Sequence, residues 1–344
     1  MNTLLLKNND EDVLKAGKIL ADGGLVAIPT ETVYGLAANA LDGNAVKRIF
    51  EAKGRPADNP LIVHIADFKD IERFELVSEI PEKAKLLARK FWSGPLTIIM
   101  PKGRGVPDEV SAGLSTVAVR FPSHKTAQAV IKAAGVPLAA PSANISGSPS
   151  PTKAEHVTAD LSGRIDAIID GGECKVGLES TVLTLAEEKP RLLRPGGITA
   201  EEIESVIGEI EIDDAVLYQL KSGEKAASPG MKYKHYSPKA EVILVVGTDR
   251  EYIDFVNSNS DITVAALCYD GDEKELKVKC LTLGAKDDFK KQAHELFDKL
   301  REIDRLPEIK KVYARCPKPD GVGMAVYNRL IRAAGFEVIE LEKL

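Results

Sequence analysis

The feature that most constrains the fold is a series of short apolar runs in the first 200 residues, each long enough for one strand. Amphipathic windows typical of helices separate several of these runs. The runs at 97–101 and 117–122 follow one another without such a window, so a strict alternation of strand and helix is excluded. We therefore expect an α/β fold whose N-terminal domain has a twisted mixed sheet with flanking helices. The expected strands are 25–29, 61–66, 96–101, 117–122, 137–141, 167–170, 180–185 and 191–195, and the expected helices are 10–22, 43–52, 82–91, 124–134 and 152–162.

A change in composition after residue 200 predicts a boundary between two domains. Residues 201–214 contain seven acids and no base, and 221–239 are polar and mildly basic with Gly and Pro. So long a structureless run is unusual inside a compact domain. We expect a catalytic domain at 1–208, an interdomain linker or lid at 209–238 and a smaller Rossmann-like open α/β domain at 239–344. Its expected strands are 241–246, 262–269, 311–316 and 337–342, and its expected helices are 287–303 and 323–334.

The charge distribution argues against non-specific binding of nucleic acid. The net charge is −6, and residues 1–200 contain 24 basic and 24 acidic residues. Binding driven by phosphate neutralisation needs a basic surface. The four cysteines are scattered without CxxC spacing, and no apolar run reaches the ~20 residues of a membrane span. We expect a cytoplasmic protein with reduced thiols, no secretory leader and no membrane partner.

The stretch KGRPADNPLIVHI at 53–65 places two cations one residue apart. We expect an extended, non-helical loop here, in which Lys53 and Arg55 share one face and Gly54 permits close approach of a ligand. Arg offers a planar fork for phosphate or carboxylate, and Lys offers a movable point charge. The pair is therefore a candidate anion site, although two solvated surface cations are the commoner outcome for such a pair.

Polar residues also follow the other apolar runs, at strand ends where open sheets build sites. Each has a plain structural alternative: a Ser/Pro turn, an edge-strand histidine or a surface ion pair. Together they place several cations beside neutral hydroxyl and amide groups, which suits a polyanionic ligand next to a small polar one. The candidates are Thr30, Thr32, His64, Arg120, Ser142, Asn144, Ser150, Ser180 and Arg194.

Common catalytic signatures are missing from the sequence. GxxxxGK[ST], HExxH, GxSxG and a paired nucleophilic Cys–His motif do not occur. The glycines of GVGMA at 321–325 lack the third glycine of a dinucleotide fingerprint. We therefore expect chemistry that relies on positioning and charge rather than on a covalent nucleophile.

Five segments together resemble the YrdC-like domain of threonylcarbamoyl-AMP synthases: PTETVYGLAANA, KGRPADNPLIVHI, APSANISGSPSPT, LESTVLTL and LRPGGI. SPGMKYKHYSPKAEV and GVGMAVYNRLIRAA resemble the linker and C-terminal Sua-type domain of the long form of that enzyme. The resemblance covers nearly the whole chain, and its Lys-x-Arg plus Ser-x-Asn combination is specific.

The resemblance implies a role for each candidate residue. L-threonine would be held by Thr32, His64, Arg120, Ala140 (through its backbone) and Ser180. ATP would be held by Arg55, Asn59, Thr116, Ser142, Ser150 and Arg194, with Lys53 and Asn144 completing a charged pocket and with Lys53 and Arg55 as the catalytic cations.

The resemblance also implies a nucleotidyltransferase that makes threonylcarbamoyl-AMP and pyrophosphate from L-threonine, bicarbonate and ATP. The product would feed threonylcarbamoyladenosine modification of tRNA beside the anticodon, through a separate transferase machinery, so that tRNA binding by this chain is weak or indirect. Mg²⁺ would accompany the ATP phosphates, because the sequence offers no dedicated carboxylate cage; no organic cofactor is expected.

Two alternatives remain open from the sequence. The same domain type occurs in hydrogenase-maturation carbamoyltransferases, whose zinc-finger cysteines and acylphosphatase-like segment are not visible here. A non-catalytic RNA- or ribosome-binding module would need a basic first domain, and the first 200 residues are neutral.

The linker is itself a candidate part of the site. His235 and Tyr236 lie among lysines and prolines, a composition that a passive tether does not need. We expect a lid that folds over the first domain and adds His235 and Tyr236 to the ATP site. The alternative is that both side chains pack against a neighbouring domain surface.

Overall fold

A computed structural model describes residues 2–218 and 236–343, which form two compact units. The described part of the first unit comprises 2–146 and 150–216, and that of the second comprises 147–149, 217–218 and 236–343. No helix in these ranges is long and apolar enough to cross a membrane. The two units are described separately below.

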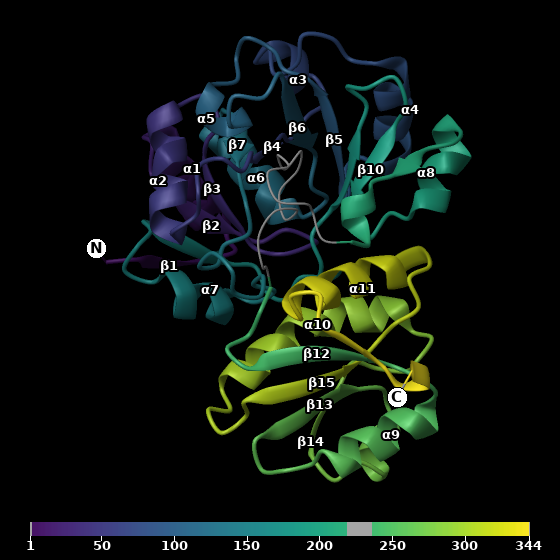
Figure 1. The fold of residues 1–344 in the computed structure, drawn as a ribbon. Helices are drawn as coiled ribbons and strands as arrows, with labels where there is room; N and C mark the ends of the chain where they lie inside the picture. Colours follow the sequence, from purple (N-terminus) through teal and green to yellow (C-terminus); the bar gives the residue numbers. More distant parts are fainter. Residues whose placement is uncertain (1, 219–235, 344) are drawn as a thin grey trace. The chain divides into compact units, whose positions relative to one another are not determined.

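Within the described residues, eleven strands of the first unit form one mixed sheet (Figure 1). Neighbouring strands β4 and β6 are parallel, whereas β5 and β6 are antiparallel, which confirms the predicted mixed sheet. The order across the sheet is β1 (Leu4–Lys7), β8 (Ala167–Asp170), β2 (Val26–Ile28), β3 (Gly35–Asn39), β7 (Leu138–Ala139), β4 (Ile62–His64), β6 (Thr116–Arg120), β5 (Leu96–Pro101), β9 (Thr181–Thr184), β10 (Arg191–Arg194) and β11 (Glu211–Ile212).

All eight strands and all five helices predicted for this unit are present. The sequence did not predict β1, β3, β11 or three of the helices, which are short or lack a clear apolar period. The helices are α1 (Asp10–Ala21), α2 (Gly43–Lys53), α3 (Asp70–Arg73), α4 (Glu82–Phe91), α5 (Asp108–Ser111), α6 (Lys125–Ala134), α7 (Ala154–Leu161) and α8 (Ala200–Ile207).

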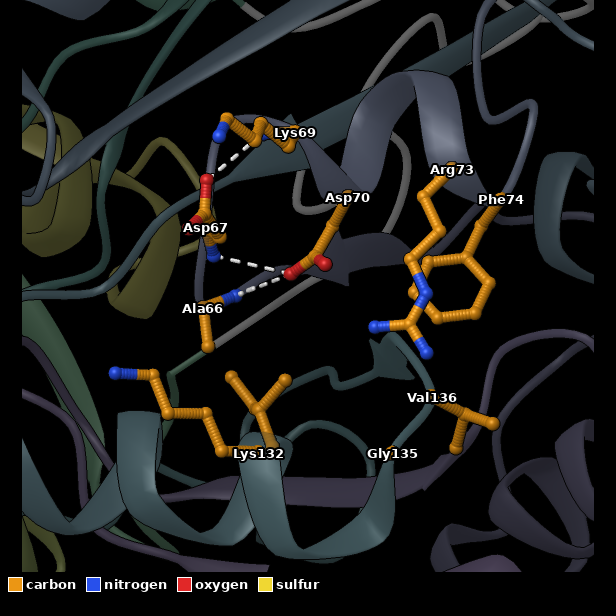
Figure 2. Close-up of a pocket in the computed structure, with 10 residues that line it drawn as sticks. Ala66, Asp67, Lys69, Asp70, Arg73, Phe74, Lys132, Gly135 and Val136 are labelled. Carbon is orange, nitrogen blue, oxygen red and sulfur yellow. Dashed lines mark hydrogen bonds between the residues drawn. The ribbon is translucent and has the colours of Figure 1, made fainter.

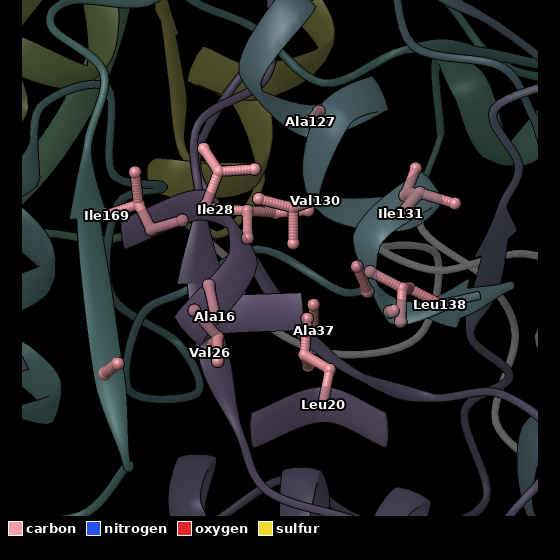
Figure 3. Packing of buried hydrophobic residues seen from close by; sticks show 14 of the residues in the cluster. Ala16, Leu20, Val26, Ile28, Ala37, Ala127, Val130, Ile131, Leu138 and Ile169 are labelled. Atoms are coloured by element: carbon pink, nitrogen blue, oxygen red, sulfur yellow. The ribbon is translucent and has the colours of Figure 1, made fainter. Parts of the chain in front are cut away.

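Helix α1 shows how the sequence builds the core of this unit. Asn9 caps it by accepting the backbone N–H of Asp12 at 2.9 Å, and acids fill the first turn. Its apolar stripe, which includes Ala16 and Leu20, faces Val130 of α6 and the central strands (Figure 3).

Close packing of α1 on α6 yields a stability prediction. A Cβ added at Gly17 would lie 2.6 Å from the Cβ of Ala133 and 2.7 Å from its backbone carbon. Gly→Ala in a helix normally stabilises, but here the added methyl forces two helices apart. We expect Gly17→Ala to lower the free energy of unfolding by about 1–3 kcal/mol, measured by urea denaturation. Lys15→Ala on the exposed face of α1 is the control, and no loss in Gly17→Ala would contradict this packing.

The described residues of the second unit form a five-stranded parallel sheet. Its order is β14 (Lys279–Thr282), β13 (Val264–Cys268), β15 (Lys311–Arg315), β12 (Glu241–Val246) and β16 (Val338–Glu340). The longer helices are α9 (Asp249–Ser258), α10 (Phe289–Asp304) and α11 (Gly321–Ala333). The predicted open α/β fold is confirmed, whereas β14 and α9 were not predicted.

Candidate functional site

The strand register of the first unit places four polar residues in one row. His64 on β4 pairs with Arg120 on β6, and Arg120 pairs in turn with Thr97 on β5. Thr97 pairs with Val182 on β9, which pairs with Arg194 on β10. Because residues paired across neighbouring strands point to the same face, His64, Arg120 and Thr97 share one face of the sheet, and Arg194, which follows a bulge in β10, reaches Ser180 there. The sequence predicted three of the four; Thr97 was missed.

Arg120 is buried and paired with an acid that the sequence analysis did not select. Its Nη2 donates to Glu31 Oε1 at 2.6 Å, and the two side chains are 5% and 8% exposed. The other oxygen of Glu31 accepts the backbone N–H of Ser123 at 3.1 Å. Two hydrogen-bonded oxygens offset part of the cost of burying both charges. The signal in the sequence was an acid between two threonines at the end of a buried run.

His64 is a neutral imidazole at physiological pH. Burial, and then the nearby charge of Arg120, lower the pKa of His64 to about 3. Its Nδ1 lies 3.1 Å from the carbonyl oxygen of Ile62, so this nitrogen carries the hydrogen. His64 can therefore orient a ligand by hydrogen bonding, but it does not take up a second proton at neutral pH.

Ser180 links the residues predicted for threonine to those predicted for ATP. Its hydroxyl oxygen lies 2.8 Å from Thr97 Oγ1 and accepts from Arg194 Nη2 at 3.1 Å. Arg194 also donates through Nε to the backbone oxygen of Ser180 at 3.0 Å. Thr32 Oγ1 lies 2.8 Å from Thr30 Oγ1, and both threonines are buried. Ala140 follows β7, and its N–H donates to Ile62 of β4 at 3.0 Å.

The expectation for Lys53 and Arg55 needs a correction. Lys53 is the last residue of helix α2 rather than part of an extended loop, so the two cations do not share one face of an extended backbone. Gly54 ends the helix with a φ of 61°, and an added Cβ there would meet nothing within 4 Å. Glycine is therefore needed for the left-handed cap, not for close approach of a ligand.

Buried Lys53 holds the loop that carries two other candidates. Its Nζ donates to the backbone oxygens of Ser142 at 2.5 Å and Asn144 at 2.6 Å, and it lies 3.4 Å from Asn144 Oδ1. The loop continues to Ser150, whose hydroxyl donates to Glu179, the neighbour of Ser180. The Lys-x-Arg and Ser-x-Asn segments of the sequence thus meet through Lys53.

Arg55 lies beyond the helix cap, near the predicted adenylate residues. Its Nη2 is 3.5 Å from the backbone oxygens of Asn59 and of Pro60. Pro60 lines one small cavity with Thr116, the first residue of β6. Arg55 thus contacts the backbone beside Pro60, which in turn shares a cavity with Thr116 at the start of β6.

Of the two candidates in the predicted linker, His235 and Tyr236, the structure describes only Tyr236. His235 lies outside the described residues. Tyr236 is described in the second unit, where its ring is buried and its centroid lies 5.2 Å from that of Phe297. Their predicted part in ATP binding stays a prediction.

A separate hollow of about 350 Å³ lies between α3 and α6 (Figure 2). Asp70 caps the backbone N–H groups of Ala66 and Asp67 at its edge, and Arg73 stacks on Phe74 beside it. None of the residues predicted for threonine or ATP lines this hollow.

The described residues contain no group of three or more His, Cys, Asp or Glu side chains that could hold a metal ion. Near the candidate ATP residues, Glu179 is a buried carboxylate hydrogen-bonded to Ser150. A divalent ion that enters with a nucleotide needs few protein ligands, because the phosphates supply most of its oxygens. This donor set fits an ion carried by ATP and does not fit a protein-bound metal centre.

The buried histidine yields a pH prediction. The unfolded His64 titrates near 6.5 and the folded one near 3, so the unfolded chain binds more protons between these values. His64 therefore lowers the free energy of unfolding as the pH falls, by about 2 kcal/mol between pH 7 and pH 5. Between pH 7 and pH 5, we expect the free energy of unfolding of His64→Gln to fall by about 2 kcal/mol less than that of the wild type. The measurement is urea unfolding followed by the fluorescence of Trp92, the one tryptophan of the chain, which lies in the first unit.

His294→Gln, in α10 of the second unit, is the matched control and should follow the wild type. If His64→Gln and the wild type lose the same free energy on acidification, His64 is not buried in its neutral form.

Comparison with known proteins shows similarity along nearly the whole chain. Residues 18–196 match the Sua5/YciO/YrdC family model, described as "Telomere recombination", and 198–335 match "Threonylcarbamoyl-AMP synthase, C-terminal domain". The chain is 50% identical to threonylcarbamoyl-AMP synthase of Pyrococcus abyssi, with 95% of each chain covered, and 46% identical to that of Bacillus subtilis, with 97% and 96% covered.

Solved structures agree with these sequence matches. The crystal structure of P. abyssi Sua5 complexed with L-threonine matches with a TM-score of 0.90 and 47% identity, covering 99% of both chains. Escherichia coli YciO matches with a TM-score of 0.50 and 25% identity, covering 57% of this chain and 96% of its own.

Proposed function

This chain belongs to the threonylcarbamoyl-AMP synthase family, and we propose that the row of polar residues from His64 to Arg194 is its catalytic site. The chain is an enzyme that makes threonylcarbamoyl-AMP, a nucleotidyl transfer that uses ATP. One observation carries the proposal: the register aligns His64, Arg120 and Thr97 on adjoining strands and Ser180 bonds to Thr97. A relative of similar fold binds L-threonine.

The threonine subsite is formed by Thr32, His64, Arg120, Ala140 and Ser180. Arg120 supplies a fixed positive charge for the carboxylate, because its pairing with Glu31 holds the guanidinium in place. His64 remains neutral and so does not repel the amino group of the substrate. Thr32 and Ser180 offer hydroxyls for the remaining polar groups of the amino acid.

The ATP subsite lies along the loops that flank this row. Arg55 neutralises phosphate charge, and the neutral groups fix the remaining contacts of the nucleotide. Lys53 acts by holding the loop 142–144 as well as by its charge. The proposed set is Lys53, Arg55, Asn59, Thr116, Ser142, Asn144, Ser150 and Arg194, with His235 and Tyr236 from the linker.

The proposed reaction needs no nucleophilic side chain. The amine of threonine condenses with bicarbonate to give a carbamate and water. An oxygen of the carbamate then attacks the α-phosphorus of ATP, and pyrophosphate leaves. Such a transfer depends on alignment and charge neutralisation. The buried Arg120 and the loop cations provide these, and the low pKa of His64 removes it as a proton carrier.

Further parts of the proposal concern partners and location. Mg²⁺ would bind with ATP and neutralise phosphate charge, and Ser150 and Glu179 would be the side chains of this chain that could offer it oxygens. The product would pass to a separate machinery that modifies tRNA, consistent with the neutral first 200 residues, and the enzyme would work in the cytoplasm. Residues 1–208 would be the catalytic domain, 209–238 the linker or lid, and 239–344 a separate domain.

A pyrophosphate-release assay tests the proposed function. We expect release that depends on both L-threonine and bicarbonate, with serine poorer than threonine and valine far poorer. A site built around a hydroxyl rejects an analogue that lacks it, because its own buried groups are left unpaired. Equal rates with valine and threonine would contradict the proposal. So would pyrophosphate release that is unchanged when L-threonine and bicarbonate are each omitted.

The role of Arg55 is tested by two substitutions. Arg55→Ala should lose about 2–4 kcal/mol of transition-state stabilisation with the fold intact, as a fall in kcat/KM of at least thirtyfold. Arg55→Lys should recover only part of this, because the planar fork is lost. Arg164→Ala, in the turn after α7, is the matched surface control. Near-normal turnover by Arg55→Ala at saturating ATP would remove Arg55 from the site.

A further inference from the structure

Two hydroxyl groups of the threonine subsite, those of Ser180 and Thr32, are each within hydrogen-bonding distance of a further buried threonine. Thr97 Oγ1 lies 2.8 Å from Ser180 Oγ, and Thr30 Oγ1 lies 2.8 Å from Thr32 Oγ1. All four residues are at most 2% exposed. A hydroxyl has one hydrogen and two lone pairs. The direction of each hydrogen bond therefore decides whether Ser180 and Thr32 present a hydrogen or a lone pair to a ligand.

The direction of the Thr30–Thr32 bond follows from a third atom. Thr30 Oγ1 also lies 2.6 Å from the carbonyl oxygen of Val33, and a carbonyl can only accept. The single hydrogen of Thr30 is thus committed to Val33. Thr30 Oγ1 also accepts the backbone N–H groups of Thr32 at 3.2 Å and of Val33 at 3.3 Å. Since the hydrogen of Thr30 is committed, the 2.8 Å contact between the two hydroxyl oxygens is a hydrogen bond only if Thr32 donates, in competition with these longer bonds. A donating Thr32 presents lone pairs to a ligand.

The direction of the Thr97–Ser180 bond follows from the lack of another acceptor. Within residues 2–218 and 236–343, Ser180 Oγ is the one hydrogen-bond partner of Thr97 Oγ1. A Thr97 hydrogen pointed elsewhere would be buried without an acceptor, at a cost of about 1–3 kcal/mol. Ser180 already accepts from Arg194 Nη2 at 3.1 Å, so accepting from Thr97 fills its second lone pair. Its own hydrogen is then the one group left for a ligand.

We propose that Thr97 and Thr30 are positioning residues that give the two hydroxyls of the threonine subsite opposite polarity. This inference rests on the proposed function. Ser180 becomes a donor and meets an acceptor oxygen of the amino acid, beside the donor Arg120. Thr32 becomes an acceptor and meets a donor, the amino group or hydroxyl of the substrate. The amino acid can then satisfy both hydroxyls in one orientation only.

Kinetics of Thr97 variants test the inference in the full-length enzyme. Thr97→Val keeps the shape of the side chain but removes the hydroxyl, so Ser180 regains a lone pair and its hydrogen is no longer directed. We expect KM for L-threonine to rise about tenfold while KM for ATP stays within about twofold. Thr97→Ser, which restores the hydroxyl, should recover most of the loss. The control Thr184→Val removes a buried threonine hydroxyl on the neighbouring strand β9, and its KM for L-threonine should match that of the wild type.

A double-mutant cycle separates positioning from packing. If Thr97 acts through Ser180, Thr97→Val should add little to KM for threonine in a Ser180→Ala background. Full additivity, an unchanged KM in Thr97→Val, or a Thr97→Ser variant as weak as Thr97→Val would each overturn the proposal. If Thr97→Val fails to fold, as judged by circular dichroism, Thr97→Cys takes its place in the cycle.

Thr30 is tested in the same way. Thr30→Val should raise KM for L-threonine several-fold and Thr30→Ser should restore it. An unchanged KM in Thr30→Val would overturn this half of the inference. A wild-type enzyme without threonine-dependent pyrophosphate release would instead contradict the proposed function itself, independently of any variant.

Discussion

The buried ion pair of Arg120 and Glu31 is the constraint on which the arrangement of the site depends. Taking two charges out of water costs several kcal/mol per ion, and the pair is tolerable only with good geometry and further hydrogen bonds. Both conditions are met, since Arg120 donates to one oxygen of Glu31 and the Ser123 N–H donates to the other. The strand register then fixes His64 and Thr97 on either side of the guanidinium. A charge that is compensated before the substrate arrives can be held rigidly in a dry part of the protein.

Lys53 gives the other half of the site its shape. The sequence suggested a cation on an extended loop, but helix α2 continues through Lys53 and ends at Gly54. Helical geometry turns the lysine toward the backbone oxygens of Ser142 and Asn144, 89 and 91 residues away. An ammonium group with carbonyl partners in a buried place is a structural tie as much as a charge. The local expectation failed because the helix end was set by a glycine cap rather than by the following prolines.

Much of the fold was predictable because its strands are apolar runs with clear ends. Strand β3, with the sequence GLAAN, has small residues and no alternation, so only its neighbours β2 and β7 define it. Helix α8 was hidden by the acidic composition of 201–214, although Thr199 and Glu202 form a capping box at its start. Single-turn helices such as α5 carry too few residues for a period to show.

The placement of candidate residues was predictable where a polar residue ends an apolar run, as His64 and Arg120 do. Thr97 lies inside such a run, where threonine is an ordinary strand residue. Its significance depends on the register of β5 with β6 and with β9, and β9 lies far from β5 in the sequence. Glu31 was missed for the same reason, since its partner lies 89 residues away. Long-range register is the part of the site that local patterns do not contain.

The two proposed subsites differ in how they are built, and this difference suits their ligands. Two of the threonine groups, His64 and Arg120, lie in paired strands, and Ala140 and Ser180 directly adjoin the strands β7 and β9, so backbone pairing fixes most of this subsite. The nucleotide groups come mainly from a helix end and from loops such as 142–150. A small amino acid is distinguished from its analogues by a few hydrogen bonds, which requires rigid partners. A nucleotide must enter and leave as pyrophosphate and product, and loops allow this. The hydrogen bond from Arg194 to Ser180 joins the two regions, so that the placement of phosphate charge and the orientation of the amino acid depend on one shared hydroxyl.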